Sequence, residues 1–98
     1  MRIKIDDNNY EIYKKVFGIF SKNMFGELQT KFSPETNPIN VLNDWEHKSI
    51  KLAKKGLQTG LNDCLSSYKN YPKEIIEKIE KDLIENNLPT LNQLTAIN

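Results

Sequence analysis

The sequence predicts an all-α fold, a compact bundle of three main helices with a short helix at the C-terminal end. Apolar residues recur at helical spacing in three long stretches, and prolines stand where helices would begin or break. Only residues 2–5 alternate apolar and basic side chains with the period of a strand. Since no second strand is in evidence, we expect this short stretch to be an extended arm.

The first helix is expected to begin at Tyr10 and to stop near Gly26. Asp6 or Asp7 can supply an oxygen that caps its N-terminus. The apolar face that predicts this helix consists of Tyr10, Tyr13, Val16, Phe17, Phe20 and Met24. The residues that follow, 26–38, are expected to form a loop tethered by Leu28 and Phe32.

The second helical region begins at Asn37 and Pro38, a pair typical of a helix start, and no proline interrupts it before Lys69. One unbroken helix of this length would span on the order of 48 Å, whereas a compact domain of this size has a radius of gyration of about 13 Å. We therefore expect a break, with Asn43 and Asp44 as the best site and Gly56 as the second.

The third helix is predicted to start so that Pro72 lies just inside it, and Asn86 or Asn87 can supply the left-handed residue that ends it. Thr90 and Gln93 have the spacing of a capping box, which predicts a short final helix. The expected apolar stripe of the third helix is Ile75, Ile76, Ile79, Leu83 and Ile84, and that of the final helix is Leu91, Leu94 and Ile97.

Length and composition limit the classes of function. A chain of 98 residues predicts a single helical domain over residues 1–98. With 14 basic and 13 acidic side chains, the formal net charge of +1 gives no global field that would attract nucleic acid or an anionic membrane. No apolar run approaches the roughly 20 residues of a membrane span. A single cysteine and the strong excess of lysine over arginine favour the cytoplasm of a bacterium with an A/T-rich genome.

Small residues form a strip along the second helical region, beside an apolar stripe of Ile50, Leu57, Leu61, Leu65 and Tyr68. The strip is Ser49, Ala53, Gly56, Gly60, Cys64 and Ser67. Two glycines in one helix predict that another backbone packs closely against it. Their GxxxG spacing fits neither a Walker loop nor a dinucleotide fold. The charged and amide side chains around them exclude a membrane dimer.

Catalytic and metal-binding motifs are not found in the sequence. The only thiol, Cys64, could act as a nucleophile with His47 only if a break at Gly56 brought the two together. A lone histidine without HxxxH or CxxC spacing predicts no zinc site. Asp44 and Glu46 are interpreted as a helix cap and a first-turn acid. We expect no enzyme activity, no cofactor and no bound metal.

Two features predict binding. Trp45 and Leu52 lie off the main apolar stripe; either the first helix covers them, or they form an exposed patch for a partner. The segment HKSIKLAKK, residues 47–55, carries four lysines and no acid. Lys48, Lys51 and Lys55 fall on one stripe of the helical wheel, and together with Lys54 they are the candidate contacts.

The expected function is protein–protein binding by a small non-enzymatic protein of the inhibitor, immunity or adaptor type. The alternative is a weak nucleic-acid-binding domain whose lysine stripe contacts the phosphate backbone. The near absence of arginine and the acidic third helix weigh against this alternative.

Overall fold

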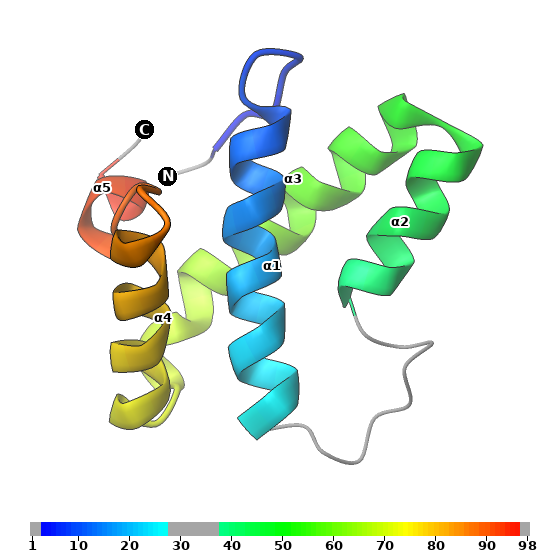
Figure 1. Ribbon diagram of the computed structural model, residues 1–98. Helices are drawn as coiled ribbons and strands as arrows, with labels where there is room; N and C mark the ends of the chain where they lie inside the picture. Colours follow the sequence, from blue (N-terminus) through cyan, green and yellow to red (C-terminus); the bar gives the residue numbers. More distant parts are fainter. Residues whose placement is uncertain (1–2, 28–37, 97–98) are drawn as a thin grey trace.

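Residues 3–27 and 38–96 are described by a computed structural model, and this part of the chain contains helices, turns and a short N-terminal arm but no strand (Figure 1). The all-α prediction is therefore confirmed. In chain order the elements are α1 (Tyr10–Glu27), α2 (Pro38–Lys48), α3 (Ile50–Ser67), the 3₁₀ turn η2 (Tyr68–Asn70), α4 (Lys73–Glu85) and α5 (Leu91–Thr95).

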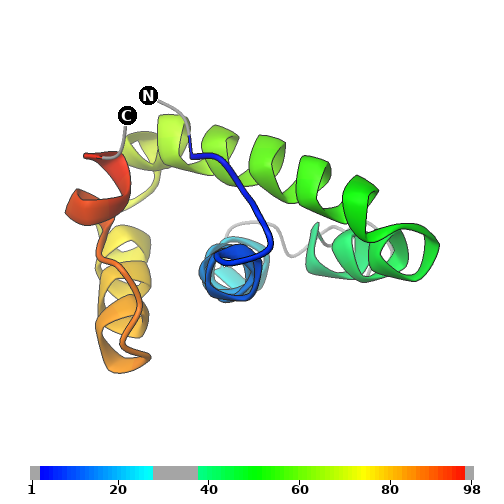
Figure 2. The same ribbon diagram turned by 90° about the horizontal axis from the view of Figure 1, so that it is seen from above.

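The helices are arranged around α3. Figure 2 shows α4, α1 and α2 lined up on the same side of α3, with α1 between the other two. α1 packs against both α3 and α4, whereas α2 packs chiefly against α3. The buried apolar core comprises Ile3, Tyr10, Val16, Phe17, Phe20, Leu42, Ala53, Leu57, Leu61, Leu65, Ile75, Ile79, Leu83, Leu91 and Leu94. Ile50, expected on the apolar stripe, is instead 50% exposed, because it lies in the first turn of α3 beyond the packed helices.

The N-terminal arm is extended, as expected, and binds to side chains of α3. The side chain of Asn62 accepts a hydrogen bond from the Ile3 N–H at 2.8 Å and donates one to the Ile3 carbonyl at 3.1 Å. Gln58 accepts one from the Ile5 N–H at 2.9 Å. These amides replace the neighbouring strand that an extended backbone otherwise needs. The side chain of Ile3 is 1% exposed.

The start of α1 agrees with the sequence. The Asp6 carboxylate accepts hydrogen bonds from the Asn8 and Asn9 N–H groups, and the Asn9 side chain accepts one from the Asp6 N–H. This reciprocal arrangement fixes the turn from which the helix begins. α1 continues through Gly26 to Glu27, one residue beyond the expected stop. The expected loop contacts at Leu28 and Phe32 lie outside the described residues.

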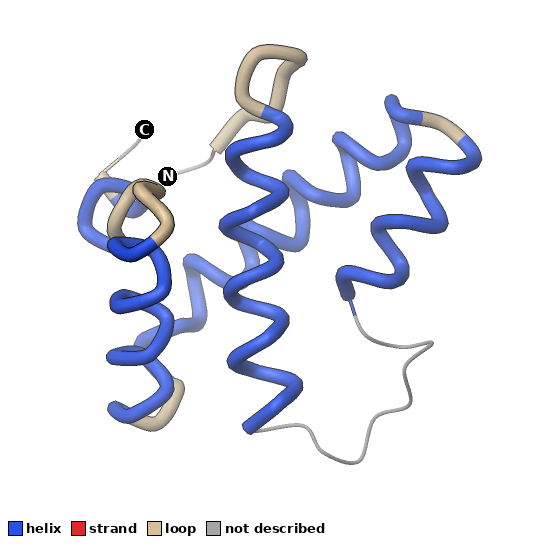
Figure 3. Tube along the Cα trace, in the orientation of Figure 1, coloured by secondary structure: helices blue, strands red, loops and turns tan. Residues whose placement is uncertain are grey.

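The break between α2 and α3 lies at Ser49, so both predicted positions, Asn43–Asp44 and Gly56, are wrong. Ser49 has an extended backbone (φ −168°, ψ 125°), and its hydroxyl accepts a hydrogen bond from the Leu52 N–H at 3.4 Å. Figure 3 shows the turn that separates the two helices. With the break at this serine, α2 folds back and packs along α3.

The ends of α4 and α5 follow the predicted signals. Pro72, expected just inside the helix, instead precedes α4 and takes the N-cap position. Asn87 has a positive φ of 57°, and the Leu88 N–H donates to the Leu83 carbonyl at 2.9 Å. These features form a Schellman motif. The capping box of α5 is confirmed at Thr90 and Gln93.

Two residues of the expected C-terminal stripes, Ile84 and Ile97, are not seen in the buried core. Ile84, placed on the buried stripe of α4, is 58% exposed, because it lies one residue round the helix from the fully buried Leu83. Ile97, expected on the final helix, lies outside the described residues.

Candidate functional site

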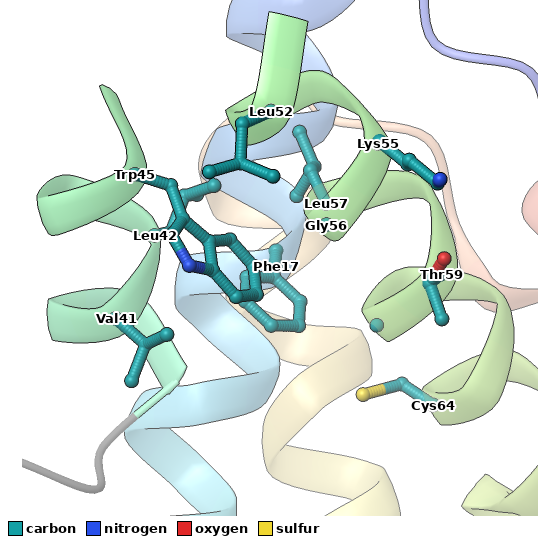
Figure 4. Close-up of a pocket in the computed structure, with 11 residues that line it drawn as sticks. Phe17, Val41, Leu42, Trp45, Leu52, Lys55, Gly56, Leu57, Thr59 and Cys64 are labelled. Atoms are coloured by element: carbon teal, nitrogen blue, oxygen red, sulfur yellow. The ribbon is translucent and has the colours of Figure 1, made fainter. Parts of the chain in front are cut away.

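An apolar groove of about 610 Å³ lies between α2 and α3, with Phe17 of α1 at its base. Figure 4 shows Trp45 projecting from α2 toward α3, with Leu52 beside the indole and Phe17 behind it. The lining residues are Phe17, Val41, Leu42, Trp45, Leu52, Lys55, Gly56, Leu57, Thr59, Gly60 and Cys64. An open groove of this size with so few polar groups is typical of a binding site.

The groove results from the contact between Trp45 and Gly56. A Cβ atom added at Gly56 would overlap the six-membered ring of the indole, so only glycine allows the ring to lie this close to the α3 backbone. At Gly60 an added Cβ would lie 3.1 and 3.2 Å from two atoms of the Phe17 ring. The strip of small residues therefore does admit close packing, but aromatic rings approach it rather than the expected second backbone.

Trp45 and Leu52, the apolar residues predicted to bind a partner, are brought together at this groove. The indole is half-buried on α3, and Leu52 is 42% exposed. The expected cover of both residues by the first helix is therefore wrong for Leu52. Its exposure follows from the break at Ser49, because Leu52 lies in the first turn of α3 at the mouth of the groove.

The four predicted lysines differ in their surroundings. Lys54 forms an ion pair with Asp7 beside the N-terminal arm. Lys48, Lys51 and Lys55 are exposed, and Lys55 lines the groove. Within residues 3–27 and 38–96, these three ammonium groups take part in no ion pair. A positive patch thus borders the groove near the turn that joins α2 to α3.

Glu46 has a role that the sequence did not indicate. It lies near the end of α2, so the interpretations of Asp44 as a cap and Glu46 as a first-turn acid are wrong. Its carboxylate accepts hydrogen bonds from Lys14 at 2.8 and 2.9 Å and from the Tyr10 hydroxyl at 2.6 Å. Lys14, and then Tyr10, hold the pKa of Glu46 below its usual value. This polar link fixes α2 to α1 next to Trp45.

The chemistry available at Cys64 is limited. Burial raises the pKa of its thiol to about 11, although a hydrogen bond with Tyr71 acts in the opposite direction. The group is therefore protonated at neutral pH, whereas nucleophiles and metal ligands are thiolates. His47 lies beside the turn at Ser49, so about 22 Å of α3 separates it along the helix axis from Cys64. The hairpin does not bring this pair together.

The described part of the chain has neither a cluster of metal-binding side chains nor a membrane-spanning helix. No group of three or more histidine, cysteine, aspartate or glutamate side chains there could hold a metal ion. None of the described helices combines the length and the apolar character of a membrane span.

No family model matches the chain, and no curated protein or solved structure shows significant similarity to it. The candidate site therefore depends on geometry alone. Sequence reasoning identified Trp45 and Leu52 but missed Val41 and Phe17 as groove residues. The one signal for Val41 was its position one helical turn before Trp45.

Proposed function

We propose that this protein acts by binding another protein, and that the groove between α2 and α3 holds apolar side chains of that partner. This is a non-enzymatic role of the inhibitor, immunity or adaptor type. The main support is a half-buried tryptophan beside a leucine that is 42% exposed, both lining one open apolar groove. Tryptophan anchors of this kind contribute a large share of the energy at protein interfaces.

The setting of this function is also a proposal. We place the protein in the cytoplasm of a bacterium. The single free thiol of Cys64 agrees with a reducing compartment. The excess of lysine over arginine agrees with an A/T-rich genome.

The test uses Leu52→Asp, which places a charge at the mouth of the groove without removing a buried side chain. Tagged wild-type protein and the variant are used to capture proteins from nuclease-treated lysate of the source cells. The matched control is Ile84→Asp on α4, because Ile84 is also exposed, at 58%. We expect a stoichiometric partner with the wild type and the control, and its loss with Leu52→Asp.

Two results would contradict this function. The partner could remain bound to Leu52→Asp, which would place the interface elsewhere. It could also be lost equally with both variants, which would show a general effect of added charge. Circular dichroism and thermal unfolding of the purified proteins establish that all of them are folded.

A second function, weak nucleic-acid binding, is supported by the three exposed lysines that lack ion pairs, Lys48, Lys51 and Lys55. The pairing of Lys54 with Asp7 removes one of the four cations on which this function depended. Binding of labelled single- and double-stranded oligonucleotides at several salt concentrations tests it. Three phosphate contacts give a logarithmic salt slope of about −2 to −3. A triple change of these lysines to glutamate should abolish that binding.

A further inference from the structure

The groove has a charged border on one side, and this border restricts what can occupy it. Lys55 lines the groove, and Lys51 lies one helical turn before it on α3. Lys48 ends α2 three residues after Trp45, so both project from nearly the same face of that helix. The exposed acids nearest in sequence are Asp44 on α2 and Asp63 in the last turns of α3. The positive charge is therefore concentrated where the two helices meet.

We propose that the occupant is an amphipathic helix of the partner, with apolar side chains at helical spacing and carboxylates along one flank. This inference depends on the proposed function and adds the chemistry of the bound segment. The apolar side chains lie against Trp45, Leu52 and Val41. The carboxylates lie opposite Lys48, Lys51 and Lys55, which no described acid neutralises.

A helix is the form of peptide that suits this site. Two packed helices expose a groove between their ridges into which a third helix can fit. The lining offers no exposed strand edge, because α2 and α3 satisfy their backbone groups internally. An extended peptide bound there would therefore leave its own amide groups without hydrogen-bond partners. Apolar anchors at positions i, i+3, i+4 and i+7 place successive side chains along the groove.

The charge complementarity predicts selectivity more than affinity. Exposed ion pairs are individually weak, and three of them together change the dissociation constant by about 3-fold to 150-fold. They also raise the association rate at low salt and disfavour basic segments. The apolar contacts supply most of the binding energy.

The first part of the test is selection of 16-residue random peptides displayed on phage, with the purified protein as the target. Parallel selections use Leu52→Asp, and only peptides that require Leu52 are analysed. We expect these peptides to carry apolar residues at helical spacing and an excess of aspartate and glutamate. Trp45 is the only tryptophan, so its fluorescence reports binding of synthetic tryptophan-free versions.

The second part measures the role of the lysines. The variant with Lys48→Glu, Lys51→Glu and Lys55→Glu is compared with a control that carries Lys15→Glu, Lys22→Glu and Lys73→Glu. Both change the net charge equally, and the control lysines are exposed residues of α1 and α4 that do not line the groove. We expect at least about a 3-fold loss of affinity for the selected acidic peptides with the first variant. The control should lose less than about 2-fold.

The outcomes separate the two proposals. If no selected peptide requires Leu52, the proposed function is wrong and the inference is wrong with it. If Leu52-dependent peptides are neutral or basic, or bind both triple variants equally well, the inference is wrong while the proposed function stands. Sedimentation velocity of the protein alone tests whether a second copy of the chain occupies the groove. A dimer that Leu52→Asp dissociates would show that a second copy fills the groove, which would also overturn the inference.

Discussion

The α1–α4 and α2–α3 pairs of helices bury their contact faces in different ways. On α4, the isoleucine and leucine side chains of Ile75, Ile79 and Leu83 are 5%, 0% and 0% exposed. Between α2 and α3, the flat indole of Trp45 lies on Gly56, which has no side chain, near the buried Leu42 and Leu57. Branched side chains fill the space between helices, whereas a ring resting on bare backbone leaves space at its edges. The second arrangement produces a groove.

The polar contacts of the two sides also differ in how far they are buried. On the α1–α4 side, the buried Asn23 amide donates a hydrogen bond to the Asp82 carboxylate at 3.0 Å, inside the contact between the helices. On the α2 side, the polar groups of Lys14 and Glu46 remain about a quarter exposed, with side-chain values of 27% and 24%. The α1–α4 side is therefore the more completely buried of the two, and the proposed binding site lies on the less completely buried α2–α3 side.

The largest expected effect is the loss of stability when a buried side chain on the α1–α4 side is shortened to alanine. Ile79→Ala should lower the free energy of unfolding by about 2–5 kcal/mol, because Ile79 is fully buried and leaves a cavity. Leu52→Ala should cost about 1 kcal/mol or less, because that side chain is 42% exposed. Urea unfolding followed by circular dichroism measures both values. Similar losses for the two variants would show that the groove side is packed as tightly as the core.

A smaller effect is expected from substitutions of three helical glycines. Gly56→Ala should destabilise the protein by about 1–3 kcal/mol, since its Cβ would overlap the Trp45 ring. Gly18→Ala should instead stabilise it by up to about 1 kcal/mol, because the added Cβ would meet no atom within 4 Å beyond the adjoining backbone and alanine favours the helix. Gly60→Ala should fall between them. Thermal unfolding gives the order, and stabilisation by Gly56→Ala would mean that the indole is free to move aside.

Local sequence signals predicted the parts of the fold that depend on neighbouring residues. The cap at Asp6, the left-handed Asn87 and the Thr90–Gln93 capping box each act within a few residues of the chain. The same holds for the buried face of α4 except at Ile84, where the helical pattern alone could not tell how far round the helix the neighbouring elements reach.

Features that depend on distant residues were predicted less well. Asn43 and Ser49 are both good capping residues, and the choice between them follows from the packing of Trp45 on Gly56, which only the folded hairpin brings about. The pairing of Lys54 with Asp7 joins residues far apart in the chain, so the sequence could place Lys54 off the stripe of the other three lysines but could not identify its partner. Trp45 and Leu52 were predicted as candidates because they lay off the buried stripe. The groove that they line could not be predicted, because it depends on where α2 packs against α3.

The smallest expected effect concerns the polar link that holds α2 to α1. Because Lys14 and Tyr10 lower the pKa of Glu46, the folded state favours its carboxylate, and this contribution is complete above the unfolded value of about 4.3. It is lost as the pH falls through the lower pKa of the folded state. Glu46→Gln should therefore be less stable than the wild type at pH 7, by about 1 kcal/mol or less, and should differ less from it at pH 3.

Urea unfolding of both proteins at the two pH values measures the change, and the other carboxyl groups cancel in the comparison because both proteins carry them. A difference between wild type and Glu46→Gln that stays constant with pH would show that the carboxylate charge contributes nothing to the link. A difference that shrinks in acid would show that α2, and with it one wall of the groove, is attached partly by charge. The packing of α1 on α4, where Ile75, Ile79 and Leu83 are buried by apolar contact, does not involve Glu46 and should not change in this comparison.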